Sequence, residues 1–211
     1  MKRLAVLGAS GHGKVVADAA ELAGWNEIVF FDDAWPSRNT NGIWKVAGDT
    51  TSLLAAGGQF DGVVVAIGDN RVRLEKQNLL LERSLPVVSV IHPAAVVSRY
   101  AAIGTGSVLF AGAVVNAGAA LGQGCIINTG ASVDHDCVLE AGVHVSPGAR
   151  LGGAVRVGKI TWIGIGACVR QCVSIGAGAM VGAGAAVVSN VPDSVTVVGV
   201  PARAVPPSGD I

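Results

Sequence analysis

A six-residue hydrophobic period dominates the second half of the chain. Every sixth residue is Val, Ile or Leu, and the position four residues after each of them holds a small or modest side chain. This period fits neither a helix of 3.6 residues nor a strand of 2, and it predicts a prism in which each hexapeptide supplies one short strand and one corner. The aliphatic positions are Ile91, Val97, Ile103, Leu109, Val115, Leu121, Ile127, Val133, Leu139, Val145, Leu151, Val157, Ile163, Val169, Ile175, Val181 and Val187.

Three hexapeptides close one coil of about 18 residues, so successive coils bury their aliphatic side chains against one another as in any solenoid. Glycine often follows the aliphatic residue, as at Gly104 and Gly176. We expect these glycines to supply backbone freedom at the corners. The period predicts the prism but not its handedness.

The first half of the chain has a different pattern, in which buried apolar strands alternate with amphipathic helices. This alternation predicts a parallel sheet with crossover helices. Charged residues become sparse near residue 90, and we place an α/β domain at residues 1–88 and a β-helix at residues 89–211. The predicted strands are Arg3–Leu7, Glu27–Phe31, Gly62–Ile67 and Val87–Val90, and the predicted helices are Lys14–Ala23, Thr50–Ala56 and Arg71–Arg83.

Composition and charge exclude several classes of partner. Lys plus Arg and Asp plus Glu both number 15, so the basic excess of a nucleic-acid or anionic-membrane binder is missing. The apolar run Leu4–Leu7 is too short for a signal peptide or a membrane span, and we expect a cytoplasmic protein. The four cysteines have no CxxC spacing, and we interpret them as small packing residues.

A glycine-rich turn, GASGHG at residues 8–13, lies between the first predicted strand and helix. Backbone N–H groups at such a helix start can bind a phosphate, and a carboxylate about 20 residues later can meet a ribose or base edge. The domain is too short for a dinucleotide fold, so a nucleotide or nucleotide-sugar fits better, with a purely structural turn as the alternative. The candidate site residues here are Gly11, His12, Gly13, Asp32, Asp33, Gly68 and Asn70.

Several segments together resemble one family. GASGHGKVVADAA, FFDDA, AIGDN and NTGASVDHDCVLEAGVHVSPGARLGG resemble the bacterial acetyltransferases that N-acetylate a UDP-linked 4-amino-4,6-dideoxy sugar, and residues 182–202 resemble the hexapeptide acyltransferase signature. The resemblance implies a Rossmann-like α/β domain followed by a left-handed parallel β-helix. It also implies acetyl-CoA as co-substrate and a homotrimer with the cofactor between neighbouring prisms.

The same resemblance implies roles for individual residues. His135 corresponds to the catalytic base, and Asp136 to the acidic residue that orients it. His144 corresponds to a histidine near the thioester, and Gly153 to a backbone N–H that faces the thioester oxygen. The resemblance further implies that Asn128 and His12 contact the substrate and that Ile163, Gly164, Gly182 and Pro201 contact the cofactor.

The chemistry of this histidine agrees with the implied role. An imidazole titrates near pH 6.5 and is suited to removing a proton from an attacking amine or hydroxyl. His135 is flanked by Asp134 and Asp136 and interrupts an apolar repeat. His135 and His144 are nine residues apart, which is half a coil, so their co-operation requires a neighbouring protomer.

Two alternatives remain open, and a third is disfavoured. The same base could serve O-acetylation of a sialic acid or related glycan, or the protein could be a non-catalytic nucleotide-sensing trimer. A γ-class carbonic anhydrase would need three clustered histidines, whereas His92, His135 and His144 have no such spacing. We therefore expect no metal.

Overall fold

The computed structural model describes residues 1–205 and divides into two units, Met1–Pro93 and Ala94–Ile211. The boundary lies between Pro93 and Ala94, a few residues after the predicted change at residue 88. Each unit forms its own core.

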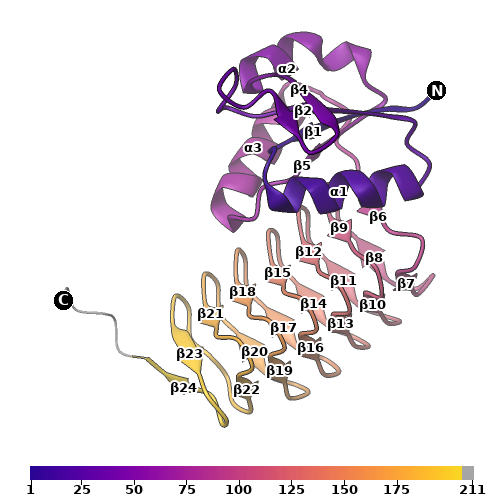
Figure 1. Cartoon of the computed structure of the whole chain (residues 1–211). Helices are drawn as coiled ribbons and strands as arrows, with labels where there is room; N and C mark the ends of the chain where they lie inside the picture. The colour runs from indigo at the N-terminus through magenta and orange to yellow at the C-terminus, as the bar shows by residue number, and fades with distance from the viewer. Residues whose placement is uncertain (206–211) are drawn as a thin grey trace, which may run out of the picture. The chain divides into compact units, whose positions relative to one another are not determined.

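The first unit is a five-stranded sheet with helices (Figure 1), in the order β3-β4-β2-β1-β5. β1 pairs in parallel with β2 on one side and with β5 on the other, so the direction of strand addition reverses at β1. In open α/β sheets, ligands bind at the carboxyl ends of the strands at such a reversal. The strands of this sheet are β1 (Arg3–Leu7), β2 (Glu27–Phe31), β3 (Thr40–Asn41), β4 (Trp44–Gly48) and β5 (Gly62–Val65), whereas β6 (Val90–Ile91) stands outside it.

The helices of this unit are close to their predicted positions: α2 has the predicted bounds, and α1 and α3 begin earlier than predicted. They are α1 (Gly11–Leu22), α2 (Thr50–Ala56), the 3₁₀ turn η1 (Gly57–Gln59) and α3 (Asn70–Glu82). α1 begins inside the glycine-rich turn, because glycine at a first turn costs little when the turn also packs against the sheet. α3 begins at Asn70 because the Asp69 carboxylate accepts hydrogen bonds from the N–H groups of Arg71 and Val72.

The segment 33–48 contains two strands that the sequence analysis did not predict. β3 and β4 form an antiparallel hairpin, and β4 continues the main sheet by pairing with β2. Trp44 packs against Phe30 with 6.0 Å between ring centroids, and its indole N–H donates to Glu21. These are contacts between residues distant in sequence, so local periodicity gave no signal for them.

The second unit is a three-sided parallel β-helix, whose stacked two-residue strands Figure 1 shows from β7 to β22. From β7 to β19, each strand pairs in register with the strand 18 residues later, as Val115 does with Val133. The 18-residue coil predicted from the hexapeptide period is therefore confirmed. The strands of the first face are β7 (Val96–Val97), β10 (Val114–Val115), β13 (Ser132–Val133), β16 (Arg150–Leu151), β19 (Cys168–Val169) and β22 (Ala186–Val187).

The second and third faces follow the same rule. The second consists of β8 (Ala102–Ile103), β11 (Ala120–Leu121), β14 (Val138–Leu139), β17 (Arg156–Val157) and β20 (Ser174–Ile175). The third includes β9 (Val108–Leu109), β12 (Ile126–Ile127), β15 (His144–Val145), β18 (Trp162–Ile163), β21 (Met180–Val181), β23 (Thr196–Val198) and β24 (Arg203–Ala204). β24 pairs antiparallel with β23 and ends the described chain.

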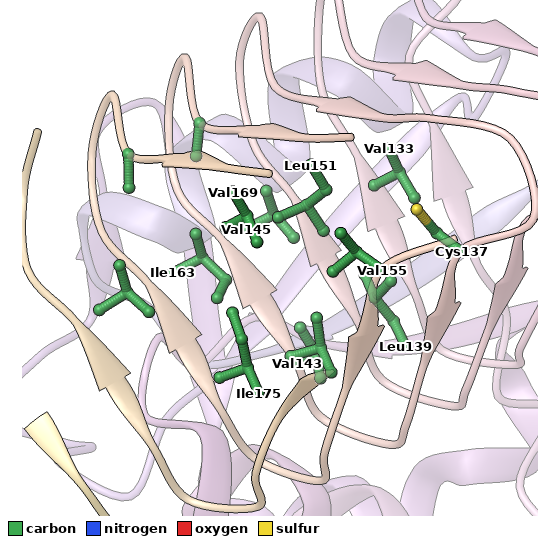
Figure 2. Close-up of a cluster of buried hydrophobic side chains, with 14 of the residues drawn as sticks. Val133, Cys137, Leu139, Val143, Val145, Leu151, Val155, Ile163, Val169 and Ile175 are labelled. Carbon is green, nitrogen blue, oxygen red and sulfur yellow. The ribbon is translucent and has the colours of Figure 1, made fainter. Parts of the chain in front are cut away.

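The aliphatic residues of the repeat fill the interior of the prism. Figure 2 shows Val133 from the first face and Val145 and Ile163 from the third, all within the interior, and all three are fully buried. The small residues four positions later, such as Cys137 and Ala149, are buried at the corners. Each coil contributes apolar area only to its neighbours, which makes burial between coils the main stabilising term.

The expectation that the glycines after the aliphatic residues supply backbone freedom at the corners is wrong. Gly104 and Gly176 do not have left-handed backbones, and a Cβ on Gly104 would collide with the backbone at Gly122. Their absent side chains therefore allow close stacking of coils rather than turning of the chain. The corner residue with a left-handed backbone stands three positions after the aliphatic residue, as at Gly118 and Gly148.

The cysteines also divide into two groups. Cys125 and Cys137 are buried packing residues, as predicted. Cys168 and Cys172 are exposed, which contradicts the prediction for them, because Cys168 lies at an outward strand position and Cys172 at a corner.

Candidate active site

The first cluster of candidate residues lies at the carboxyl edge of the sheet in the first unit. A pocket of about 270 Å³ opens there, lined by the ends of β1 and β2, the segment after β5, and α3. The lining residues are Leu7, Gly8, Ser10, Asp32, Asp33, Ile67, Val72 and Lys76. The pocket lies at the reversal of strand order, as expected for a ligand site in this architecture.

Asp32 and Asp33 both line the pocket, and each also stabilises a neighbouring loop. Asp32 accepts a hydrogen bond from the N–H of Ala9 at 2.7 Å, which fixes the glycine-rich turn beside β2. Arg38 reaches the same carboxylate at 3.2 Å and also donates to the carbonyl of Ala9. Asp32, the candidate ribose contact at the end of β2, therefore also holds the glycine-rich turn that is the candidate phosphate site.

Asp33 is paired with a cation. Its Oδ2 lies 2.6 Å from Lys76 Nζ, and its Oδ1 accepts from the N–H of Thr50. Partial burial raises the pKa of this carboxyl group, but the hydrogen bonds from Lys76 and Thr50 outweigh it and lower the pKa to about 2. Asp33 is therefore ionised throughout the neutral range. Lys76 was not predicted, because only the fold brings α3 to this edge.

The glycines of the turn have different roles. Gly13 is buried, and a Cβ there would meet the carbonyl of Gly8 and the ring of Phe30. Gly13 therefore packs against protein on the side where a Cβ would stand, and its ligand contact stays a prediction. A Cβ on Gly11 or Gly68 would meet nothing within 4 Å, so both lie beside open space.

The two helices at this edge differ at their N-termini. Asp69 caps α3, whereas Ser10 makes no side-chain cap hydrogen bond at the start of α1. The first N–H groups of a helix lack intrahelical acceptors, so the start of α1 retains donors suited to an anion.

His12 and Asn70 lie deeper than expected. Burial, reinforced by the positive charge of Arg73, lowers the pKa of His12 to about 4, so the imidazole is neutral at neutral pH. Asn70 is buried and accepts a hydrogen bond from Arg73 at 2.7 Å. Arg73 is itself buried and also donates to the carbonyls of Ile67 and Gly68, so it stabilises the turn between β5 and α3.

The second cluster lies at a corner of the β-helix, between β13 and β14. His135 Nδ1 and Asp136 Oδ2 are 2.8 Å apart, and the side chains are 61% and 67% exposed. The hydrogen bond to Asp136, together with the charge of Asp134, raises the pKa of His135. With Nδ1 carrying the proton toward Asp136, Nε2 is the ring nitrogen with a free lone pair.

Asp134 supports the backbone of this corner. Its Oδ1 accepts hydrogen bonds from Asn116 Nδ2 and from the N–H of His135, both at 2.8 Å. The hydrogen bond from Asn116 is the main reason that the pKa of Asp134 is lowered. Asn116 was missed by the sequence analysis, although its position 18 residues before Asp134 was a usable signal.

His135 lies against the next coil. A Cβ placed on Gly153 would be 2.5 Å from His135 Nε2 and 2.6 Å from Cε1, so the imidazole covers the Gly153 backbone. The predicted base and the predicted backbone donor are therefore brought together, although they are 18 residues apart in sequence.

His144 lies on the third face of the prism, in β15, and is 5% exposed. Its Nε2 lies 3.1 Å from Asn128 Nδ2, and its ring packs at 4.1 Å on Trp162, one coil later. The structure thus brings together His144 and Asn128, two predicted site residues. His135 lies elsewhere, at the corner between β13 and β14. Trp162 was missed, and its 18-residue spacing from His144 was the available signal.

The remaining predicted cofactor residues are in the later coils. Ile163 is fully buried in the prism, so only its backbone is available to a ligand, and its cofactor contact stays a prediction. Gly164 and Gly182 follow aliphatic residues, and a Cβ on Gly164 would collide with the next coil. Pro201 is exposed near the end of the described chain.

Three comparisons identify what the chain is similar to. The family model described as PglD N-terminal domain matches residues 3–80. The acetyltransferase domain of PglB from Neisseria gonorrhoeae, solved with acetyl coenzyme A, is 46% identical with a TM-score of 0.92, over 97% of this chain and 99% of that one. The chain belongs to the hexapeptide-repeat acetyltransferase family. Its β-helix has the left-handed form predicted from the resemblance.

Two further relatives of this acetyltransferase differ in the sugar nucleotide that they name. A histidine-to-alanine variant of GDP-perosamine N-acetyl transferase from Caulobacter crescentus, solved with CoA and GDP-perosamine, is 39% identical with a TM-score of 0.91, over 100% of this chain and 98% of that one. UDP-N-acetylbacillosamine N-acetyltransferase of Bacillus subtilis is 37% identical over 114 residues. That match spans 53% of this chain and 52% of the relative.

None of the helices within residues 1–205 has the length and apolar character needed to cross a membrane. In the same part of the chain, no three His, Cys, Asp or Glu side chains gather where they could hold a metal ion.

Proposed function

We propose that this acetyltransferase transfers the acetyl group of acetyl-CoA to the 4-amino group of a UDP-linked amino-dideoxy sugar, with His135 as general base. The observation that carries the proposal is the His135–Asp136 hydrogen bond, with the His135 ring lying over the backbone of Gly153. The nucleotide-sugar and CoA named for the relatives support the choice of substrates.

The reaction uses each group at a stated atom. The sugar amine attacks the thioester carbonyl carbon while His135 Nε2 takes the amine proton, and Asp136 stabilises the imidazolium through Nδ1. The N–H of Gly153 donates to the developing oxyanion. The C–S bond then breaks, and the thiolate of CoA leaves and takes up the proton from His135.

The first unit binds the nucleotide in this proposal. The uncapped start of α1 receives the diphosphate, and the pocket containing Asp32 receives the ribose or base. The open space at Gly11 and Gly68 supports ligand approach at the same edge. Neutral His12 faces the sugar nucleotide in the manner expected from the resemblance, and a neutral imidazole can accept or donate a hydrogen bond there.

A panel assay tests the proposal. Release of the CoA thiol is measured with UDP- and GDP-linked 4-amino sugars and with free sialic acid as acceptors. We expect turnover with UDP-linked 4-amino sugars and little with sialic acid. Preference for GDP-linked sugars would overturn the choice of nucleotide, and turnover of sialic acid alone would establish O-acetylation instead.

A further inference from the structure

Two glycines from the coils before and after flank the His135–Asp136 pair. Gly118 precedes Asp136 by one coil, and Gly153 follows His135 by one coil (136 − 118 = 18; 153 − 135 = 18). Both approach the functional side chains at contact distance. The reason for having glycine differs between the two positions.

At Gly153, turn geometry does not demand glycine. Its φ lies outside the left-handed region, and this position of the repeat holds ordinary side chains elsewhere in the prism. A Cβ here would enter the imidazole of His135, 2.5 Å from Nε2. The position of the His135 ring therefore explains why residue 153 is glycine. The residues at the same position of the repeat include Thr129, Ala141, Pro147, Lys159, Ile165 and Gln171.

At Gly118, two demands coincide. Its φ of +75° favours glycine, as at other corners. In addition, a Cβ on Gly118 would lie 2.5 Å from Asp136 Oδ1. Gly130, Gly148 and Gly166 have the same left-handed corner backbone, yet a Cβ on each would meet nothing within 4 Å. Contact with a carboxylate therefore distinguishes Gly118 from these corners.

The pair needs such support because it is exposed. Side chains that are 61% and 67% exposed have few packing neighbours to fix their rotamers. The backbone of Gly153 beside the imidazole, and that of Gly118 beside the carboxylate, limit the positions that the two side chains can take. Loss of positioning by about 1 Å can cost about 100-fold in rate.

We propose that Gly118 and Gly153 are positioning residues for acetyl transfer, which act by giving Asp136 and His135 side-chain-free backbone surfaces on which to lie. This inference rests on the proposed function of His135. It assigns to Gly153 a role through its missing side chain, in addition to the role expected for its N–H.

Activity measurements with matched controls form the first test. Gly153→Ala and Gly118→Ala should lower kcat by about 10- to 100-fold, with a smaller change in the KM for acetyl-CoA. Gln171→Ala changes the same position of the repeat one coil later, and Gly148→Ala imposes the same left-handed strain without a contact. Both controls should keep kcat within about twofold of the parent. An equal loss in Gly148→Ala and Gly118→Ala would overturn the assignment of Gly118.

Double variants separate positioning from general damage. Gly118→Ala should cost nothing further in an Asp136→Ala background, and Gly153→Ala nothing further in a His135→Ala background. Additive losses would show that each glycine acts independently of the side chain above it, and would overturn the proposal.

Titration of His135 by NMR tests the geometry without relying on activity. Asp136 raises the pKa of His135, and Asp134 is the other charged group that acts on the ring. Displacing Asp136 by Gly118→Ala should lower the pKa of His135, whereas Gly148→Ala should leave it unchanged. An unchanged pKa in Gly118→Ala would overturn the role of Gly118. If the pKa falls but His135→Ala retains normal kcat, the positioning is real and the proposed function of His135 is wrong.

Discussion

The acid–base chemistry of the proposed site is set by three neighbouring residues. Asp134 fixes the backbone N–H of His135, and Asp136 bonds to the ring, so one carboxylate fixes the main chain and the other fixes the tautomer. Asp136 adopts a left-handed backbone with φ of 59°, which is uncommon outside glycine. This conformation turns the carboxylate back toward its own neighbour and makes the contact between adjacent residues geometrically accessible.

Replacing His135 by alanine should lower kcat by about 10²–10⁴-fold, because a positioned general base contributes that order. The affinity for acetyl-CoA should change little, since the imidazole takes its proton from the amine. Steady-state kinetics and calorimetry with CoA measure the two effects. A near-normal kcat would place the base elsewhere, and His144 would be the next residue to replace.

Replacing Asp136 by asparagine should shift the pH profile as well as the rate. Because Asp136 raises the pKa of His135, the parent enzyme should lose kcat/KM on the acid side at a higher pH than a histidine of ordinary pKa would give. Removing the carboxylate charge lowers that pKa, so the acid limb of Asp136→Asn should move to lower pH. An unmoved limb would assign it to the substrate amine, whose protonation is common to both enzymes.

At the scale of the elements, a hexapeptide of the prism can hold both a buried and an exposed aliphatic side chain. Within one hexapeptide, Ile163 is fully buried and Ile165 is 62% exposed. The chain therefore contains two isoleucines of the same coil that differ in burial.

This contrast gives a stability prediction with an internal control. Ile163→Ala should lower the free energy of unfolding by about 2–5 kcal/mol, because it removes buried apolar volume and leaves a cavity. Ile165→Ala should change it by less than about 0.5 kcal/mol. Chemical denaturation of the two variants measures both values. If Ile163→Ala were instead well folded with weakened acetyl-CoA binding, the buried assignment of its side chain would be wrong.

At the scale of the whole molecule, the two predicted histidines belong to different parts of one prism. His135 lies at the corner after β13, whereas His144 lies in β15 on the third face. Their joint action on one thioester, as the resemblance implies, requires one histidine from each of two neighbouring chains.

We therefore expect a homotrimer formed through the β-helices. Light scattering at micromolar concentration should give three times the mass of one 21.1 kDa chain. Mixing His135→Ala with His144→Ala chains should restore part of the activity that either variant lacks, if the site is shared. A monomer with full activity would contradict the assembly and the shared site together.

The sequence by itself determined the prism, because a strict hexapeptide period has one compact solution in which every sixth aliphatic residue points inward. It also located the His135–Asp136 pair, since adjacent residues need no folding information to be recognised. The buried identity of Ile163 was equally available from the period, although the resemblance led to a different role for it.

Only the tertiary structure decided which distant residues meet. The stacking of coils in register creates three of these contacts, which are Gly153 with His135, Gly118 with Asp136, and Trp162 with His144. Lys76 beside Asp33 depends on the packing of α3 at the sheet edge. The hairpin β3–β4 depends on pairing with β2. The physical reason is common to these cases, because a local pattern fixes which face a side chain occupies, whereas contacts between remote segments arise only when the elements pack.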